Sequence, residues 1–361
     1  MRVVQKLLCV CLAVLFLLSG VCFAGLAADS PATLTIACSN VAGLPIPALF
    51  SPGHKLVPAA EKKLGRMLNA SGADVVCVQE DFQYHGLLAA EMTNYPYRTF
   101  TSGGIPVGDG LNVFSRYPLY NVERVAWETF SGILTNDNDG LTPKGFLKCT
   151  LDVNGILLDL YDIHTDAYKT MEDQLAKKAQ FTQLSDYIDA HSAGRPILIT
   201  GDFNCTLHTY YYADFYETMI AGAGFSDVWV EVVNGGNYLR GDDADEVIAR
   251  YNAQYDDRFK GLWDSYERLV YRDGGGVSFT PTAHSYDFYT DRPDKPQALS
   301  DHAVMTCTLR IDTQDYARPH TELRMSADRS LPEKIAHSVR MTARCLRLIV
   351  SDLFRLVREI F

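Results

Sequence analysis

The sequence has none of the cysteine patterns that mark a zinc protein. It contains nine cysteines but no CxxC pair and no Cys/His spacing suited to a structural zinc site. This absence excludes the zinc-finger and zinc-ribbon classes. Five of the cysteines lie in or beside apolar runs that resemble strands, namely Cys38, Cys77, Cys149, Cys205 and Cys307. We expect them to be small, buried hydrophobic side chains.

Positive charge is also scarce. The chain has 33 lysine and arginine residues against 44 aspartate and glutamate residues, which gives a formal net charge of −11. Residues 1–28 hold two bases and no acid, and residues 331–361 hold six bases and three acids. The middle of the chain is therefore strongly acidic. A body of that charge has no general attraction for polyanions, but it suits a site that binds divalent cations.

Neither an internal repeat nor a linker-like break interrupts the chain from Thr33 to Asp312, and we predict one catalytic domain over residues 30–315. Helices are expected at about residues 55–70 and 169–191. Asn154-Gly155 predicts a hairpin turn between two strands. Strands clustered in hairpins, with helices between some of them, favour mixed sheets covered by helices.

Residues 1–28 have the pattern of a leader. Arg2 and Lys6 give a basic start, and an uncharged, largely apolar run extends from Leu7 to Ala28. Small residues stand near the end of this run, where a signal peptidase needs them. The pattern predicts a cleaved secretory signal and an extracellular protein. The alternative is an uncleaved anchor, because a run of this length can just span a bilayer.

Polar residues stand where several apolar runs end. PILITGDFNCTL (196–207) delivers Asp202 and Asn204, and ADVVCVQE ends in Gln79-Glu80. Three further runs end at or follow polar residues, namely Asn40, His164 and the pair Asp301-His302. One such residue would be read as a satisfied polar group at a sheet edge. Five such places together predict that these strand ends converge on one site.

These residue types suit the hydrolysis of a phosphate ester. Carboxylate and amide oxygens are ligands that Mg²⁺ prefers, together with water and the phosphate oxygens of a substrate. A histidine oriented by an acid can take a proton from water, and a second histidine can act at the leaving group. We therefore expect Mg²⁺ as the cofactor, with Mn²⁺ or Ca²⁺ as alternatives.

The same motifs, in their order along the chain, resemble the endonuclease/exonuclease/phosphatase superfamily with its DNase I-like fold. The resemblance rests on NVAGLP, VQE, IHTDA, GDFN and SDH and covers about residues 33–311. NVAGLP and GDGLNVFSRYPL are more similar to bacterial neutral sphingomyelinase-like phosphodiesterases than to nucleases. The resemblance implies an α/β fold of four layers (α/β/β/α), in which two mixed, mostly antiparallel β-sheets pack face to face with helices outside.

The resemblance also implies roles at the metal and the phosphate. Glu80 would hold the metal ion, with Asn40 beside it. Asn204 would orient the phosphate, and Asp202 would engage the attacking water or a second metal position. Lys144, in TPKGFLKCTL, would contact a phosphate oxygen as a point charge, and the alternative is an exposed lysine in a loop before a strand.

The implied proton-transfer groups are the two histidines. His302, held in its tautomer by Asp301, would be the general base or its partner. His164 would stabilise charge at the phosphate or help the leaving group depart. Asp287 stands near an acid of the family pattern without matching it, because Phe288-Tyr289 follows, and we leave it outside the site.

The end of the chain has a pattern of its own. Residues 316–330 are polar and predict a tether. In residues 331–361 apolar residues recur at helical spacing, and arginines recur at steps of three and four on the other side. This pattern predicts a basic amphipathic helix that contacts a membrane surface. The alternative is a helix that docks on its own domain or on a partner.

Three functions are consistent with the sequence. The first is a secreted, Mg²⁺-dependent phosphodiesterase of the sphingomyelinase C type, acting on a phospholipid such as sphingomyelin. The second is an extracellular DNase I-like endonuclease, with nucleic acid as its substrate. The third is a non-catalytic surface-binding protein on the same fold, which the complete set of acids and histidines disfavours.

Overall fold

The computed structural model describes residues 32–45, 57–133, 136–167, 170–206, 210–238, 266–290 and 298–360. The predicted leader over residues 1–28 lies outside this part of the chain. The chain from Thr33 onward forms one compact unit. Among the helices that the structure describes, none combines the length and the apolar character needed to cross a bilayer.

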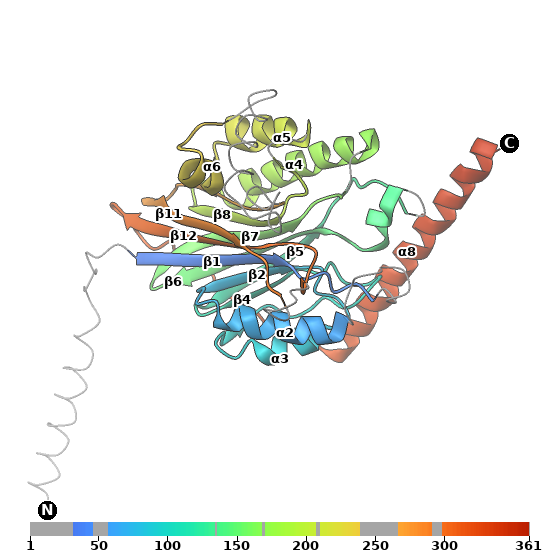
Figure 1. The fold of residues 1–361 in the computed structure, drawn as a ribbon, viewed down its shortest axis with the longest axis horizontal. Coiled ribbons are helices and arrows are strands. Elements are labelled where there is room, and N and C mark those ends of the chain that lie inside the picture. Colours follow the sequence, from blue (N-terminus) through green and yellow to red (C-terminus); the bar gives the residue numbers. More distant parts are fainter. Residues whose placement is uncertain are drawn as a thin grey trace, which may run out of the picture. The chain divides into compact units, whose positions relative to one another are not determined.

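The described strands form two six-stranded sheets (Figure 1). The first has the order β11-β12-β1-β2-β4-β3, with β1 at Ala32–Asn40, β2 at Val75–Gln79, β3 at Tyr97–Arg98, β4 at Asn112–Ser115, β11 at Val277–Asp287 and β12 at Val304–Thr313. The second has the order β5-β6-β7-β8-β10-β9, with β5 at Leu119–Ala126, β6 at Gly145–Val153, β7 at Ile156–His164, β8 at Ile197–Asp202, β9 at Ser226–Asp227 and β10 at Glu267–Arg272.

Helices cover the outer face of each sheet, as Figure 1 shows. The first sheet carries α2 (Val57–Ala70) and α3 (His85–Glu91). The second carries α4 (Met171–His191), α5 (Tyr210–Phe215), η2 (Tyr216–Gly222) and α6 (Val228–Val233). The predicted four-layer α/β/β/α fold is therefore confirmed.

Strand alternation explains why polar residues point between the sheets. Ile163 of β7 and Ile199 of β8 belong to the apolar cluster beneath the helices. Because successive strand residues point to opposite faces, His164 and Asp202 face the inner side. The pairs β1–β2 and β7–β8 are parallel, and the other pairs whose register is described are antiparallel. Parallel pairing brings carboxyl ends together, so His164 lies directly opposite Asp202.

Several local predictions are confirmed. Helices α2 and α4 begin within two residues of the expected starts and end where expected. The turn between β6 and β7 has positive φ at Asn154 (52°) and Gly155 (99°), as a tight hairpin requires. The six cysteines in the described part of the chain are free and buried.

The segment predicted as a tether is held on the edge of the second sheet. Met325 forms a β-bridge with Tyr120 of β5, and Asn121 exchanges hydrogen bonds with the backbone of Arg324 at 2.8 and 2.9 Å. Edge strands offer unpaired backbone groups that such a segment can satisfy. The predicted C-terminal helix follows as α8 (Leu331–Ile360) and is confirmed.

Candidate active site

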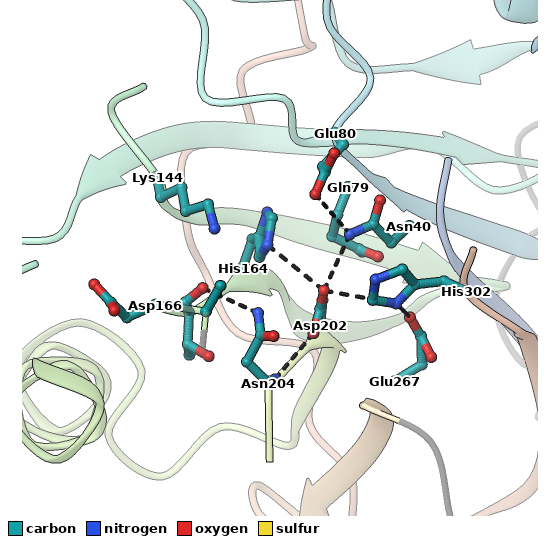
Figure 2. Close-up of polar contacts among 12 residues, drawn as sticks. Asn40, Gln79, Glu80, Lys144, His164, Asp166, Asp202, Asn204, Glu267 and His302 are labelled. Atoms are coloured by element: carbon teal, nitrogen blue, oxygen red, sulfur yellow. Dashed lines mark hydrogen bonds and ion pairs between the residues drawn. The ribbon is translucent and has the colours of Figure 1, made fainter. Parts of the chain in front are cut away.

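The polar strand ends gather around one buried carboxylate, Asp202 (Figure 2). Its Oδ2 atom accepts a hydrogen bond of 3.0 Å from Asn40 Nδ2 and lies 3.5 Å from His164 Nε2 and 3.8 Å from His302 Nδ1. Its Oδ1 atom accepts a hydrogen bond of 2.9 Å from the backbone N–H of Asn204. Strand ends of both sheets therefore meet at Asp202.

Asn40 joins Asp202 to a second acid. The Nδ2 group of Asn40 also donates to Glu80 Oε1 at 3.1 Å, while its Oδ1 accepts the backbone N–H of Ala42 at 3.0 Å. The amide thus bridges a carboxylate from each sheet. Placing two acids on one amide donor keeps them close without direct contact, which is the spacing that a shared cation would need.

An unusual backbone conformation aims Glu80 at the site. Val78, two residues earlier, packs beneath the helices, so strict alternation would direct Glu80 outward as well. Instead Glu80 has a φ of 56°, a region that non-glycine residues rarely adopt. Such strained backbone concentrates at functional sites. Burial raises the pKa of Glu80. The charge of Lys144 and the hydrogen bond from Asn40 reduce this rise.

The glycine of GDFN has a packing reason. Gly201 has a φ of 144°, and a Cβ atom there would lie 2.0 Å from the carbonyl oxygen of Ile163 on β7. Only glycine allows β8 to approach β7 this closely. After Asp202 the chain turns at Asn204, with a φ of 45°, and the Nδ2 group of Asn204 donates to Thr165 O at 3.2 Å.

The acid that holds His302 is Glu267, and the assignment of this role to Asp301 is wrong. His302 Nδ1 lies 2.5 Å from Glu267 Oε1, whereas Asp301 is exposed and makes no described hydrogen bond to the ring. Asp301 directly precedes His302, and adjacent side chains diverge. The hydroxyl of Ser300 donates to Asn40 O at 2.7 Å and accepts the backbone N–H of His302 at 3.1 Å, which ties this turn to β1.

Glu267 was missed by the sequence analysis although a signal existed. It stands at the start of β10, whose centre is the short apolar run Leu269–Tyr271, just as Asp301-His302 precedes β12. Strand β10 pairs antiparallel with β8 in a register that sets Glu267 opposite Asp202. Asp287 instead pairs with Val304 on the first sheet, and its exclusion from the site agrees with this position.

The pKa values of the two histidines are shifted in opposite directions. Burial would lower the pKa of His302, but Glu267 and Asp202 outweigh it and raise that pKa well above the usual value. Burial lowers the pKa of His164 well below the usual value, and the charge of Lys144 lowers it further. His302 is therefore a cation near neutral pH, and His164 is neutral. Burial would raise the pKa of Asp202, but the charge of His302 and the hydrogen bonds from Asn40 and the backbone N–H of Asn204 hold it below the usual value.

Lys144 belongs to the site and is not a loop lysine exposed to solvent. Its side chain is 13% exposed, and its Nζ pairs with the carboxylate of Asp139 in η1 (Asn136–Leu141). Burial would lower the pKa of Lys144, but Asp139 and Glu80 raise it, so the amine keeps its charge. That charge acts on both Glu80 and His164.

The donor set fits a hard divalent cation near Glu80. Carboxylate oxygens of Glu80 and Asp202 are of the type that Mg²⁺ prefers, and Asn40 holds both acids through its Nδ2 group. A second grouping, Asp202, Glu267 and His302, has ligand atoms within 4.8 Å of one another. There the close Glu267–His302 hydrogen bond and the raised pKa of His302 favour a proton over a metal ion. Glu80 is therefore better placed for a metal ion than this grouping, and the metal-ligand roles of Glu80 and Asn40 stay predictions.

Comparison with known proteins agrees with this geometry. The chain belongs to the endonuclease/exonuclease/phosphatase family, which matches residues 39–306. Proteins named sphingomyelinase from Mycobacterium bovis and Mycobacterium tuberculosis are 28% identical over 283 residues, covering 73% of this chain and 50% of each relative. The chain thus spans about half the length of these curated relatives.

Solved structures show the same fold. Sphingomyelinase C from Streptomyces griseocarneus is 20% identical with a TM-score of 0.50, covering 77% of this chain and 99% of that one. Beta toxin from Staphylococcus aureus with bound magnesium ions is 17% identical with a TM-score of 0.52, covering 76% and 99%. TDP2 of D. rerio with a single-strand DNA product is 18% identical with a TM-score of 0.54, covering 77% and 99%.

Proposed function

We propose that this protein is a divalent-metal-dependent phosphodiesterase that hydrolyses a phospholipid such as sphingomyelin on the headgroup side. The observation that carries the proposal is the set of contacts around Asp202, which is joined to Glu80 by the hydrogen bonds of Asn40 and lies within 4 Å of His164 and His302. It combines ligands for a metal ion with groups that transfer a proton. The family match supports a phosphoester substrate, and the sphingomyelinases among the relatives support a lipid.

Glu80 would hold the cation, with Asn40 beside it, and Mg²⁺ bound there would neutralise charge on the phosphate. Lys144 adds a fixed positive charge on the same side, because its amine stays protonated beside Asp139 and Glu80. The Nδ2 group of Asn204 stands at the turn after β8 and can orient a phosphate oxygen. These groups position the substrate and lower the cost of charge on phosphorus.

We assign His302 as the general base that takes a proton from the attacking water. Its Nδ1 is held by Glu267, which leaves Nε2 for a water molecule. In its neutral form Nε2 takes a proton from water while the water oxygen attacks phosphorus and the bond from phosphorus to the leaving oxygen breaks. The leaving oxygen takes its proton from solvent and departs as the alcohol. Glu267 and Asp202 stabilise the imidazolium that forms, as an acid does in a catalytic triad.

His164 has a different part because it is neutral and buried. Its pKa lies well below the usual value, so it does not store a proton for the leaving group. It can instead exchange a hydrogen bond with the phosphate or the leaving oxygen. Two histidines with pKa values pushed apart are typical of a site that divides acid–base work.

The second candidate is hydrolysis of nucleic acid. The structural likeness to TDP2 with a DNA product favours it, but likeness at 18% identity shows the fold alone. The acidic middle of the chain works against it, because few cations are available for phosphate contacts along a polynucleotide. Secretion, which the leader predicts, stays a prediction.

The deciding experiment compares two substrates. Purified protein is assayed with Mg²⁺ on sphingomyelin vesicles and on plasmid DNA, with EDTA and the variant His302→Ala as controls. We expect release of phosphocholine that both controls abolish, with plasmid left intact. Plasmid cleavage without lipid turnover would show that the substrate assignment is wrong. No cleavage of either substrate, or of bis-p-nitrophenyl phosphate, would favour a non-catalytic protein.

A further inference from the structure

Helix α8 has one face turned toward its own domain. Exposure falls at helical spacing along one side, at His337, Met341, Cys345, Leu348 and Asp352. A latch holds this side in place: Arg344 Nη1 donates to Gly140 O of η1 at 3.2 Å, and its guanidinium lies 5.2 Å from the centre of the Phe130 ring. The bridge between Met325 and Tyr120 of β5 holds the chain just before the helix.

A second apolar stripe runs along the outer side of α8. Its members are Ile335, Val339, Leu346, Val350, Leu353 and Val357, which are between 48% and 65% exposed. They recur at steps of three, four and seven and so share one helical face. Because the latch turns other residues inward, this stripe stays in contact with water in the free protein. A contiguous exposed apolar surface of this kind marks an interaction site.

Arginines flank the stripe and do not lie in it. At 100° per residue, Arg340, Arg347 and Arg358 lie roughly a third of a turn from the centre of the stripe. All three are exposed. Of the three acids in the helix, Glu333 lies in its first turn, Glu359 lies in its last turn, and Asp352 is buried and pairs with Arg355 at 2.8 Å. The exposed flank is therefore cationic although the chain as a whole is acidic.

We propose that the outer face of α8 lies in the interfacial region of a bilayer that contains anionic lipid. The apolar stripe would enter the boundary between headgroups and acyl chains, and the arginines would reach lipid phosphates beside it. Charges of the acidic body beyond about 8 Å are screened at physiological salt, so the cationic flank dominates near the surface. Two copies of the helix would instead bring like-charged arginine flanks together.

This inference does not depend on the proposed activity, because binding is measured without turnover. Helix α8 is nevertheless linked to the candidate active site. The latch contacts Gly140 beside Asp139, and Asp139 pairs with Lys144. A helix held at a lipid surface would therefore keep the Lys144 loop close to that surface.

The test uses vesicles of phosphatidylcholine with and without phosphatidylserine. In full-length Val350→Trp, the added tryptophan should be quenched by brominated lipids in vesicles that contain phosphatidylserine. Ser351→Trp, one residue further and outside the stripe, should be quenched much less. The wild-type signal is subtracted in both cases, and the site-specific probe is insensitive to membrane contact elsewhere in the chain.

Sedimentation with the same vesicles gives the magnitude. The double variant Leu346→Gln/Val350→Gln should bind at least about tenfold more weakly than wild type, and Arg340→Gln/Arg347→Gln should lose most of the dependence on phosphatidylserine. Ser338→Gln/Ser351→Gln is the matched control and should bind as wild type does. These positions are exposed, and circular dichroism checks that each variant folds.

Two results would overturn the proposal. One is equal quenching of Val350→Trp and Ser351→Trp, together with unchanged sedimentation of the stripe variant. The other is a concentration-dependent dimer in solution that Leu346→Gln/Val350→Gln abolishes, which would assign the stripe to a second copy of the chain.

Discussion

The Nδ1 atom of His302 lies 2.5 Å from Oε1 of Glu267, and both groups belong to strands or turns far apart in sequence. Glu267 is fully buried and Asp202 lies 3.8 Å from the same nitrogen. Two buried carboxylates so close to one imidazole make the histidine a strong base that is mostly protonated near neutral pH. We therefore expect activity to rise with pH above the usual range for histidine.

Replacing Glu267 by Gln tests which acid supports His302. The substitution keeps a hydrogen-bond acceptor but removes the charge that raises the pKa of His302. We expect kcat/KM to fall roughly tenfold to a hundredfold, and the acidic limb of the pH–rate profile to move to lower pH. Asp301→Asn is the matched control and should move the profile much less, because the exposed Asp301 adds the smaller charge effect on His302. Equal effects of the two variants would restore Asp301 as the orienting acid.

Metal binding at Glu80 should appear as a gain in stability. Mg²⁺ that binds only the folded protein raises the melting temperature by mass action, and here it also relieves the buried charge of Glu80. We expect a rise with Mg²⁺ in differential scanning fluorimetry that EDTA reverses and that Glu80→Gln strongly reduces. The exposed change Glu128→Gln should keep the full rise. A Glu80→Gln protein that responds like wild type would move the metal to other ligands.

Asp166 should make stability depend on pH. Burial, and then the charge of Asp139, raises the pKa of Asp166 from 3.8 to about 8. Between about pH 4 and pH 8 the native state then holds a proton that the unfolded chain has lost, so stability falls as pH rises. Below this range both states are protonated and the penalty is absent.

The variant Asp166→Asn removes that penalty. Its amide oxygen can accept the hydrogen bond that Ser131 N–H now donates to the carboxylate at 2.7 Å. We expect the variant to melt at the same temperature as wild type near pH 4, and several degrees higher near pH 8. Asp186→Asn, on the exposed side of α4, should show no such difference. A wild-type protein whose melting temperature rises from pH 4 to pH 8 relative to Asp166→Asn would contradict the prediction.

Gly201 should tolerate no side chain. A Cβ atom would lie 2.0 Å from Ile163 O, so Gly201→Ala must push β8 away from β7 and shift Asp202 from His164. We expect a loss of about 3 kcal/mol or more in the free energy of unfolding, measured by urea denaturation, with activity lost as well. Gly86→Ala in α3 meets nothing within 4 Å and should be neutral or slightly stabilising. Similar stability of the two variants would refute the close approach.

Local sequence patterns predicted much of the fold and most of the site. The runs that end in Asn40, Glu80, His164 and Asp202 all proved to be strands or strand ends, and these residues meet. The reason is that alternation of apolar residues and the turn residues after a strand depend on neighbours in sequence.

Which residues contact one another was harder to predict, because such contacts depend on the register between strands that are distant in sequence. Adjacency in sequence predicted Asp301 as the partner of His302, but the pairing of β10 with β8 places Glu267 there instead. Polar composition predicted a tether over residues 316–330, whereas this segment pairs with the edge strand β5.

By itself, the sequence determined which chemical groups this protein has and at which strand ends they stand. Periodicity and turn residues are local properties, and they are enough for that. Only the tertiary structure decided which carboxylate raises the pKa of His302, how a positive φ directs Glu80 into the site, and which side of α8 faces water. Those outcomes depend on how separate strands and helices pack, because burial and proximity of charges arise only when the sheets come together.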